Sequence, residues 1–278
     1  MKPAVHADWL VPDWPAPACV RSVFTTRSGG FSSLPFDSLN LGLHVGDDAH
    51  CVAHNRGVLH QAIGHVPAFM NQVHGTAVLQ LSGALQTGVP VADAAWAQTS
   101  RQVCTVMVAD CLPVLLCRTD GTWVAAAHAG WRGLAGAGGF GILEAVLSAF
   151  KGVQPMGSAG AAPELIAWLG PCIGPQAFEV GPEVRAAFVS GAPSAQRTYA
   201  AVKAQQSAIE ACFVPRHDGK YLANLPQLAR LRLAALGVHA VYGNDGSAPW
   251  CTVTQTSRFF SYRRDGVTGR MAACIWRV

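Results

Sequence analysis

The chain has 278 residues, of which 50% are hydrophobic and 13% are charged, and its formal net charge is only +4. This composition excludes an intrinsically disordered protein, and the length is sufficient for one domain with a substantial core, which we expect to span residues 1–278. The basic residues are scattered and no apolar run reaches about 18 residues, so we expect neither a nucleic-acid partner nor a membrane-spanning helix.

The cysteines and the first residues indicate a cytoplasmic protein. There are nine Cys, an odd number at irregular spacing, which argues against a disulfide framework in a chain of this length. The opening MKPAVHADWLVPDWP contains one Lys and no continuous apolar segment, so no secretory signal is predicted. We therefore expect most of the thiols to be buried as small hydrophobic side chains in a reducing compartment.

Hydrophobic runs bounded by Gly, Asp and Pro predict a mixture of strands and helices. In chain order these are strand 20–25, helix 49–63, strands 76–81, 103–108, 114–117 and 122–127, helix 134–150, strand 165–169, helices 182–188 and 222–236, and strands 240–242 and 271–276. Asp47 or Asp48 is expected to cap the first helix, and Gly237 to end the last. The segment 154–163 (QPMGSAGAAP) is expected to be a surface loop. Clusters of strands between widely separated helices predict an α+β fold, a single domain of mixed β-sheets packed by helices.

Three short motifs contain side chains that can bind a metal or take part in catalysis. They are NQVHG (71–75), ADCLP (109–113) and AHAGWRG (127–133), and the second and third directly follow apolar strands. Polar residues at strand ends face the rim of a sheet, where functional sites are commonly built. Two adjacent strands would therefore bring Cys111 and His128 together, and a third loop would supply His74.

This set of side chains suits a zinc ion. One thiolate and two imidazoles are typical zinc ligands, and three protein ligands leave a fourth position for water, as in catalytic sites. A metal there would lower the pKa of the water toward about 7. The spacing alone favours the structural alternative, a core thiol at Cys111 and structural histidines at His74 and His128, because the three residues are far apart in sequence.

The segment GWRGLAGAGG (130–139) leads from a strand end into the helix predicted at 134–150. Glycines permit close approach of the backbone to a ligand, and a helix N-terminus attracts anions. Arg132 would add a bidentate donor for phosphate or carboxylate. An ordinary glycine-rich turn with a surface arginine is the alternative.

Two carboxylates and two histidines are further candidates. Asp110 adjoins Cys111, and Asp93 lies in the VADA stretch, so either carboxylate is a candidate for proton transfer, and Asp110 could instead orient a ligand or cap a turn. His50 and His54 share one face of the helix predicted at 49–63, for which a solvated face is the preferred interpretation.

Three arginines complete the candidates. Arg56 belongs to the stretch HNR, where it would reach an anion in the pocket or form a salt bridge. Arg263 and Arg264 follow Tyr262 in a charged loop, which would either close the site or remain at the surface.

In this order, NQVHG, ADCLPVLL and AAHAGWRG resemble the YfiH family of purine nucleoside phosphorylases, whose members were long labelled polyphenol oxidases or laccase-domain proteins. The blocks FTTRSGGFS, FDSLNLGLHVGDD, HNR, WLGPCIGP, FEVGPEV and FFSYRRDGVTGRMAACIW extend the resemblance over nearly the whole chain.

The resemblance implies one zinc bound by His74, Cys111 and His128, which together with Asp110 would form the catalytic centre. It implies phosphorolysis of adenosine, inosine, guanosine or methylthioadenosine to the free base and ribose 1-phosphate, and deamination of adenosine. It also implies an α+β fold distantly similar to cysteine hydrolase toxins. The residues expected to bind substrate are Arg56, Asn71, Gln72 and Arg132.

Two alternative functions and one departure from the family pattern accompany this prediction. In a Cys–His hydrolase, such as an amidase that edits cell-wall precursors, Cys111 would be a nucleophile activated by His128. A copper polyphenol oxidase is disfavoured, since multicopper oxidases use His-x-His pairs and the ten histidines include none. Relatives often read GPAIGPC, whereas here Cys172 lies earlier and Gln176 takes the later position, so Cys172 is assigned no role.

Overall fold

The computed structural model describes residues 6–83, 88–152, 164–191 and 199–278. The surface loop predicted at 154–163 lies outside these residues. The α-helices are α1 (Ala49–Ile63), α2 (Trp131–Ala135), α3 (Ile142–Gly152), α4 (Pro182–Ser190), α5 (Tyr199–Glu210), α6 (Leu225–Ala235) and α7 (Tyr262–Asp265), with short 3-10 helices at His217–Gly219 and Ala248–Trp250. The strands are β1 (Val20–Phe24), β2 (Pro67–Ala68), β3 (Val78–Gln80), β4 (Ala94–Ala97), β5 (Val103–Val108), β6 (Leu112–Arg118), β7 (Val124–Ala129), β8 (Leu165–Leu169), β9 (Glu179–Val180), β10 (Phe213–Pro215), β11 (Tyr221–Ala223), β12 (Ala240–Gly243) and β13 (Met271–Arg277).

The strands form two large mixed sheets and one small one. The six-stranded sheet has the order β12-β8-β6-β7-β4-β3, and its two outermost pairings, β12 with β8 and β4 with β3, are parallel. The four-stranded sheet has the order β1-β13-β5-β2, with β2 parallel to β5. The small sheet, β10-β11-β9, is antiparallel.

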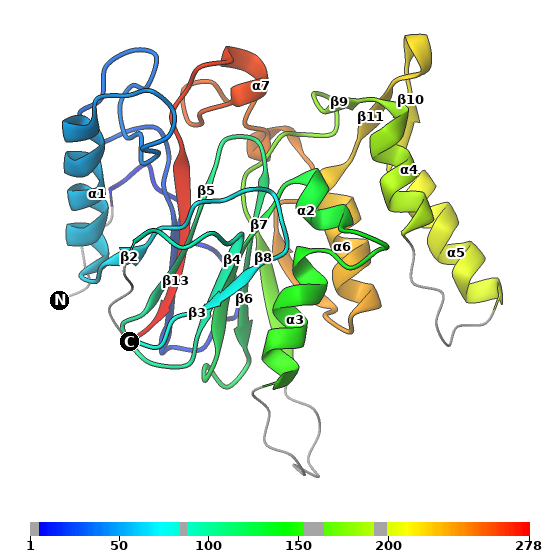
Figure 1. The fold of residues 1–278 in the computed structure, drawn as a ribbon, viewed down its shortest axis with the longest axis horizontal. Helices are drawn as coiled ribbons and strands as arrows, with labels where there is room; N and C mark the ends of the chain where they lie inside the picture. Colours follow the sequence, from blue (N-terminus) through cyan, green and yellow to red (C-terminus); the bar gives the residue numbers. More distant parts are fainter. Residues whose placement is uncertain (1–5, 84–87, 153–163, 192–198) are drawn as a thin grey trace.

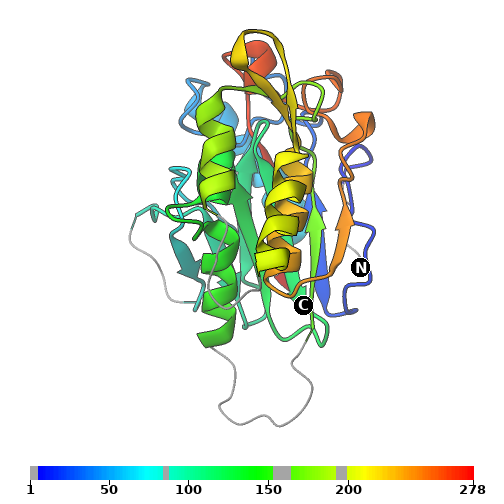
Figure 2. The ribbon, with the colours of Figure 1, turned by 90° about the vertical axis from the view of Figure 1, so that its right-hand side faces the viewer.

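The two large sheets pack face to face, and helices cover the outer face of each (Figures 1 and 2). Helix α1 lies against the four-stranded sheet, whereas α3 and α6 lie against the six-stranded sheet. The core accordingly has three parts, one between the sheets and one beneath the helices on either side. The predicted α+β class of mixed sheets packed by helices is confirmed.

Strand β13 shows how one short sequence serves two parts of this core. Met271, Ala273 and Ile275 enter the core between the sheets, and the alternate residues Ala272 and Cys274 enter the core beneath α1. This alternation follows from the two-residue period of a strand. Both faces of β13 are buried, so its sequence is continuously apolar, which is why the strand was predictable.

Helix α1 begins and ends as predicted. The side chain of Asp48 accepts a hydrogen bond from the backbone N–H of His50, which satisfies one of the free donors of the first turn. The helix ends at Gly64, whose φ of 78° is left-handed and strains any residue that carries a Cβ.

The prediction of one continuous helix at 134–150 is wrong. The chain forms the five-residue α2, then a turn, and then α3 from Ile142. Gly136 and Gly139 in this turn both have positive φ, and a Cβ at Gly136 would collide with the carbonyl group of Phe140. The glycines therefore break the helix, and the long helix N-terminus that was expected to attract an anion beside Arg132 does not exist.

The other differences between the predicted and observed elements concern element bounds and elements that were missed. The helix expected at 222–236 begins only at Leu225, because Tyr221–Ala223 pairs as β11. Strand β3 is shorter than the predicted strand at 76–81. The elements that were not predicted are β2, β4, β9, β10, α5 and α7.

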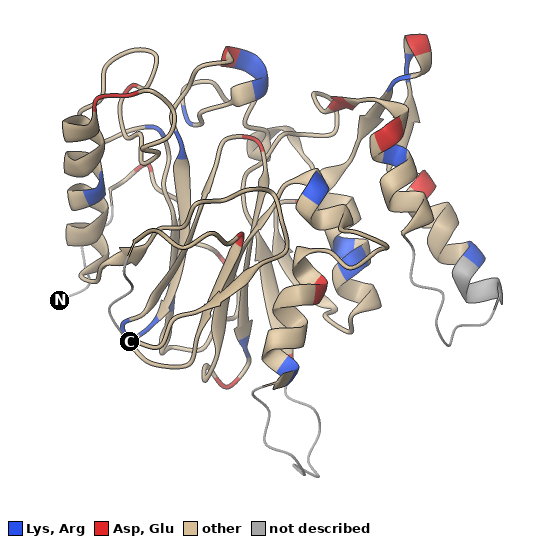
Figure 3. Cartoon of the chain, in the orientation of Figure 1, with Lys and Arg blue, Asp and Glu red and all other residues tan. Residues whose placement is uncertain are grey.

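The charged side chains are dispersed over the fold (Figure 3). Lys and Arg residues are spread over many elements and do not gather on one of them (Figure 3). In the described part of the chain, no helix is both long enough and apolar enough to span a bilayer.

A buried ion pair connects α6 to the turn between α2 and α3. Arg232 and Glu144 are only 7% and 8% exposed, and Nη1 of Arg232 lies 2.9 Å from Oε1 of Glu144. The guanidinium also donates to the carbonyl groups of Gly139 and Ala135, at 2.6 and 2.8 Å. Oε2 of Glu144 accepts the N–H of Gly141 at 2.9 Å, so the network holds both sides of the turn.

We expect Arg232→Ala to lower the free energy of unfolding by about 3–5 kcal/mol, because it leaves the Glu144 carboxylate buried without its counter-ion. Arg185→Ala is a matched control, because it removes the more exposed pair with Glu210 and should cost at most about 1 kcal/mol. Urea denaturation followed by circular dichroism measures both. Equal losses in the two variants would contradict the structural role given to Arg232.

Candidate metal centre and active site

The three predicted metal ligands meet at one edge of the six-stranded sheet. Cys111 immediately precedes β6, and His128 is the penultimate residue of β7, where it pairs in register with Pro113. His74 comes from the loop that precedes β3 and has a left-handed φ of 61°. The pairing of β6 with β7 therefore brings Cys111 and His128 together, and the loop adds His74.

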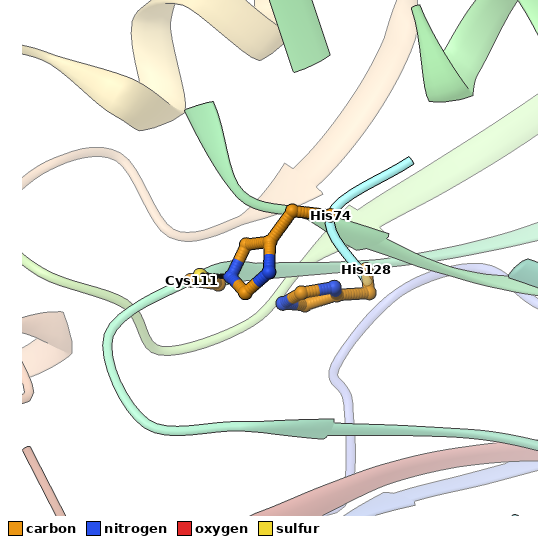
Figure 4. A group of neighbouring side chains, drawn as sticks. All are labelled: His74, Cys111 and His128. Carbon is orange, nitrogen blue, oxygen red and sulfur yellow. Dashed lines mark hydrogen bonds between the residues drawn. The ribbon is translucent and has the colours of Figure 1, made fainter. Parts of the chain in front are cut away.

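The geometry of this group suits a metal ion. The ligand atoms of His74, Cys111 and His128 all lie within 4.8 Å of one another. Sγ of Cys111 is 3.6 Å from Nε2 of His74, and the two imidazole rings meet edge to face with centroids 4.8 Å apart. Figure 4 shows the three side chains grouped around one position. Among the described residues, this is the one group of three or more His, Cys, Asp or Glu so arranged.

Hydrogen bonds to Asp93 hold both histidines in place. Its carboxylate is completely buried and accepts the backbone N–H groups of Val73, His74 and Gly75, at 3.2, 2.9 and 2.7 Å. Its Oδ1 also lies 2.8 Å from Nδ1 of His128. This contact leaves Nε2 of His128 for a metal, as in carboxylate–histidine–metal arrangements. Asp93 is therefore a positioning residue for the centre.

Two glycines allow the His74 loop to approach the strand end. A Cβ at Gly130 would lie 2.7 Å from Cδ2 of His74 and 3.0 Å from Sγ of Cys111. A Cβ at Gly133 would lie 2.9 Å from the carbonyl oxygen of Gly75. The predicted close approach of this glycine-rich segment is thus real, but its immediate neighbour is the metal-ligand loop.

The charges of the centre stabilise one another. Burial raises the pKa of the Cys111 thiol, but His128 and His74 lower it more, so that it falls from 9.0 to about 6. Burial lowers the pKa of His128, whereas Cys111 and Asp93 raise it more, from 6.5 to about 9. Without a metal the group is therefore a thiolate beside an imidazolium. The hydrogen bonds to His128 and Gly75 lower the pKa of Asp93 despite its burial.

A cavity of about 520 Å³ opens over this group. That volume is in the range of sites for small molecules. Its apolar and aromatic wall is formed by Met107, Val108, Ala109, Trp131, Ile173, Phe178, Leu225 and Tyr262. Its polar lining consists of His44, Gln72, His74, Asp110, Cys111, His128, Arg132, Arg263 and Arg270.

Two of the four predicted substrate-binding residues line the cavity. The amide of Gln72 pairs with the backbone of Met107 in both directions, at 2.8 and 2.7 Å, and so fixes the His74 loop to β5. Arg132 is exposed, and its guanidinium lies 4.4 Å from the centroid of the Trp131 ring. It remains able to donate to a ligand.

The other two predicted residues are not part of the lining. Asn71 pairs through its backbone with Pro90 and Ala92 at the edge of the loop. Arg56 donates to the carbonyl oxygen of Leu41 at 2.9 Å and lies 3.8 Å from the centroid of the Phe69 ring. Burial lowers its pKa to about 10. Direct contact of Asn71 and Arg56 with substrate stays a prediction.

Asp110 lines the cavity, but both of its carboxylate oxygens already have donors. Oδ1 accepts the hydroxyl of Thr252 and Oδ2 accepts the backbone N–H of Arg263, each at 2.6 Å. Asp110 therefore holds the loop that carries Arg263, which lines the cavity as well. Arg264 instead pairs with Asp265 and donates to backbone carbonyl groups. The predicted role of Asp110 in proton transfer stays a prediction.

The remaining candidates have local structural contacts. The rings of His54 and Phe31 are tilted by 45° with centroids 3.7 Å apart, and His50 lies in the capped first turn of α1. Cys172 is fully buried and accepts a hydrogen bond from Asn244 at 3.4 Å, and burial raises the pKa of its thiol. These contacts agree with the structural interpretation of all three residues.

Sequence reasoning missed two basic residues of the cavity, His44 and Arg270. Both lie in stretches that the family resemblance had quoted, FDSLNLGLHVGDD and FFSYRRDGVTGRMAACIW. No sequence motif contains both residues, since they are 226 positions apart in the printed sequence (270 − 44). Only the family blocks drew attention to these segments.

We expect Asp93→Asn to weaken the binding of added Zn²⁺ by about 10- to 100-fold, because an amide stabilises neither the His74 loop nor the His128 ring as a carboxylate does. Competition with a chromophoric chelator measures this affinity. Asp120→Asn is the matched control, since Asp120 lies in the turn between β6 and β7. A wild-type affinity in Asp93→Asn would refute the positioning role.

In the metal-free protein, we expect alkylation of Cys111 by iodoacetamide to follow a pKa of about 6, because the two histidines stabilise the thiolate. The rate should be nearly constant above about pH 7 and should fall as the pH decreases through 6, where the thiolate is protonated. Site-resolved mass spectrometry follows the reaction, with the partly exposed Cys51 as an internal reference. An inflection near 9 would show that the histidines do not act on this thiol.

Comparison with known proteins identifies the family. A model of the family described as multi-copper polyphenol oxidoreductase laccase matches residues 21–278. Protein PA4543 of Pseudomonas aeruginosa, which is named a purine nucleoside phosphorylase, is 48% identical over 96% of this chain and 98% of its own length. Purine nucleoside phosphorylase YfiH of Escherichia coli is 47% identical over 97% of this chain and 98% of its own.

Solved structures agree with this assignment. Protein NMB0706 of Neisseria meningitidis superposes with a TM-score of 0.81 at 46% identity, covering 97% of this chain and 99% of that one. YlmD from Geobacillus stearothermophilus gives a TM-score of 0.75 at 30% identity, covering 94% and 92%. The chain therefore belongs to the YfiH family, the group of proteins that the laccase-like family model describes.

Proposed function

We propose that this protein is a zinc-dependent purine nucleoside phosphorylase that also deaminates adenosine. One observation carries the proposal: one cysteine and two histidines converge in a cavity that also presents aromatic and basic side chains. Relatives at 48% and 47% identity are named purine nucleoside phosphorylases. The substrates would be adenosine, inosine, guanosine or methylthioadenosine, together with inorganic phosphate.

The ligand types suit zinc, and one of their three separations matches tetrahedral coordination. Tetrahedral zinc with bonds of about 2.3 Å to sulfur and about 2.0–2.1 Å to nitrogen needs a sulfur–nitrogen separation of roughly 3.6 Å. The separation between Cys111 and His74 is 3.6 Å. A buried carboxylate behind His128 and three protein ligands, which leave a fourth position, are further features of catalytic zinc sites. Bound there, zinc would supply Lewis acidity and activate water near neutral pH.

A multicopper centre is not supported. All ten histidines lie in the described residues, they form no His-x-His pair, and only His74 and His128 join a metal-holding group. The single group of one thiolate and two imidazoles therefore supports a single metal.

The cavity wall would bind the nucleoside. Trp131, Phe178 and Tyr262 offer aromatic surfaces on which a purine can stack. In phosphorolysis, a phosphate oxygen forms a bond to ribose C1′ while the bond from C1′ to the base nitrogen breaks, and the base leaves with a proton. The arginines of the lining would bind the anionic groups and the ribose hydroxyls.

Both activities would use one cavity. Deamination occurs at purine C6 and phosphorolysis at ribose C1′, and these carbons are several ångströms apart on the nucleoside. We infer that the nucleoside binds in two orientations, because the largely apolar wall distinguishes them only weakly. His74 then serves both reactions.

We expect His74→Ala to abolish both reactions and to remove the bound zinc, of which the wild-type protein should contain about one per chain. The assay incubates adenosine with and without phosphate, separates the products by chromatography and measures zinc by elemental analysis. Adenine and ribose 1-phosphate should require phosphate, whereas inosine should not. Loss of deamination with normal phosphorolysis would overturn the shared site, and absence of both reactions in the zinc-loaded wild-type protein would overturn the proposed function.

One observation favours a second candidate. The lowered pKa of Cys111 beside His128 is also typical of a Cys–His hydrolase, such as an amidase acting on cell-wall precursors. The two functions differ in the effect of zinc on the thiol. A zinc ligand is protected from iodoacetamide by the metal, whereas a nucleophile reacts rapidly in the active protein.

We also propose a cytoplasmic location. All nine cysteines are free thiols, which is typical of proteins in a reducing compartment.

A further inference from the structure

A basic corner of the cavity is separate from the metal ligands. It consists of His44 and Arg270, which we call the Arg270 corner. His44 lies in the loop that precedes α1, and Arg270 immediately precedes β13. Both residues line the same cavity as the metal-ligand group.

Backbone contacts hold these two segments side by side. The N–H of Leu41 donates to the carbonyl oxygen of Arg270 at 3.1 Å, and the buried Oδ1 of Asn40 accepts the N–H of Arg270 at 2.9 Å. A Cβ at Gly42 would lie 2.8 Å from Cγ of Arg270, so the side chain of the arginine passes directly over this glycine. Tightly packed backbone therefore holds the half-buried Arg270 in place, whereas the side chain of His44 is exposed beside it.

The guanidinium of Arg270 has spare donors. Its Nη1 donates to the carbonyl oxygens of Thr268 and Gly269, at 3.0 and 3.1 Å. Nε and Nη2 have no protein acceptor among the described residues, and neither Arg270 nor His44 forms an ion pair with a described carboxylate. A partly buried guanidinium with two free N–H groups in one plane matches two oxygens of an oxyanion.

The surrounding charges also favour an anion. Partial burial lowers the pKa of His44, and the positive charges of Arg270 and Arg56 lower it further. Burial likewise lowers the pKa of Arg270, against the opposing effects of Cys111 and Asp110. Two basic side chains, His44 and Arg270, thus share the cavity with the metal-ligand group, and the carboxylate of the lining, Asp110, is already occupied by two donors.

We propose that the Arg270 corner binds the inorganic phosphate that attacks the nucleoside, with the Nε and Nη2 groups of Arg270 and the imidazole of His44 as donors. This inference rests on the proposed phosphorolysis. It assigns Arg132, which is exposed and stacked on Trp131, to the nucleoside and not to phosphate. The anion would lie in the same cavity as the metal-ligand group, since Arg270, His44 and Cys111 all line it.

The corner can be tested by phosphate binding without nucleoside. Isothermal titration of inorganic phosphate into the zinc-loaded protein at constant ionic strength gives the affinity directly. We expect Arg270→Gln and His44→Gln to weaken it by about tenfold or more, because each removes a hydrogen bond to a charged group. Arg270→Lys should recover part of the loss, since it retains the charge but not the planar fork.

Three controls locate the binding. Arg132→Ala and the surface variant Arg185→Ala should bind phosphate as the wild type does. His74→Ala, which disrupts the metal centre, should still bind phosphate, whereas phosphate held only by the metal would be lost. Acetate at the same ionic strength should compete weakly, and strong competition by acetate would identify a carboxylate site instead. Circular dichroism establishes that each variant is folded.

The outcomes separate this inference from the proposed function. Phosphate binding that depends on Arg270, in a protein without phosphorolysis, would support the corner and overturn the function. Phosphorolysis with unchanged phosphate affinity in folded Arg270→Gln, or an effect confined to Arg132→Ala, would overturn the corner and leave the function standing. Absence of phosphate binding in the wild type would also overturn the corner.

Discussion

The buried carboxylate of Asp93 is the interaction on which the site depends. Removing such a charge from water costs several kcal/mol unless its oxygens are fully bonded. Here three consecutive N–H groups of residues 73–75 and the imidazole of His128 satisfy it. To point three N–H groups at one carboxylate, the loop takes a left-handed conformation at His74, and it packs so closely on the strand end that Gly130 and Gly133 have no room for a side chain.

The layered fold explains why the polar residues gather at one edge. The central strands of the two large sheets, β5, β6, β7, β8 and β13, are buried on both faces, so they are largely apolar along their length. Functional groups can therefore enter only where the strands end, as Cys111 and His128 do, or from loops that cross that edge, as His74 and Arg270 do. The small sheet and the α7 loop extend the same edge, and Phe178 and Arg263 from these segments help to line the cavity.

Much of the fold and of the candidate site could be predicted from the sequence, and each wrong or missing prediction has a physical reason. Helix α1, β5 and β8 have the predicted bounds, because caps and continuous apolar runs are local signals. The three residues predicted to hold a metal were identified through the family motifs and not through their spacing, and the fold brings them together. The contact of Asp93 with His128, the break after α2 and the packing of Gly42 under Arg270 all depend on segments brought together by the tertiary fold. The four-residue β4, largely alanine, carried too weak a local signal to be recognised.

The position of β13 also constrains how the protein is made. Although it is the last strand in the sequence, it lies between β1 and β5 in the four-stranded sheet and forms hydrogen bonds with both. During translation, the edges of β1 and β5 that pair with β13 therefore keep unpaired backbone N–H and C=O groups until β13 has left the ribosome. Arg270 directly precedes β13, so the chain cannot form the whole cavity before this same segment has been synthesised.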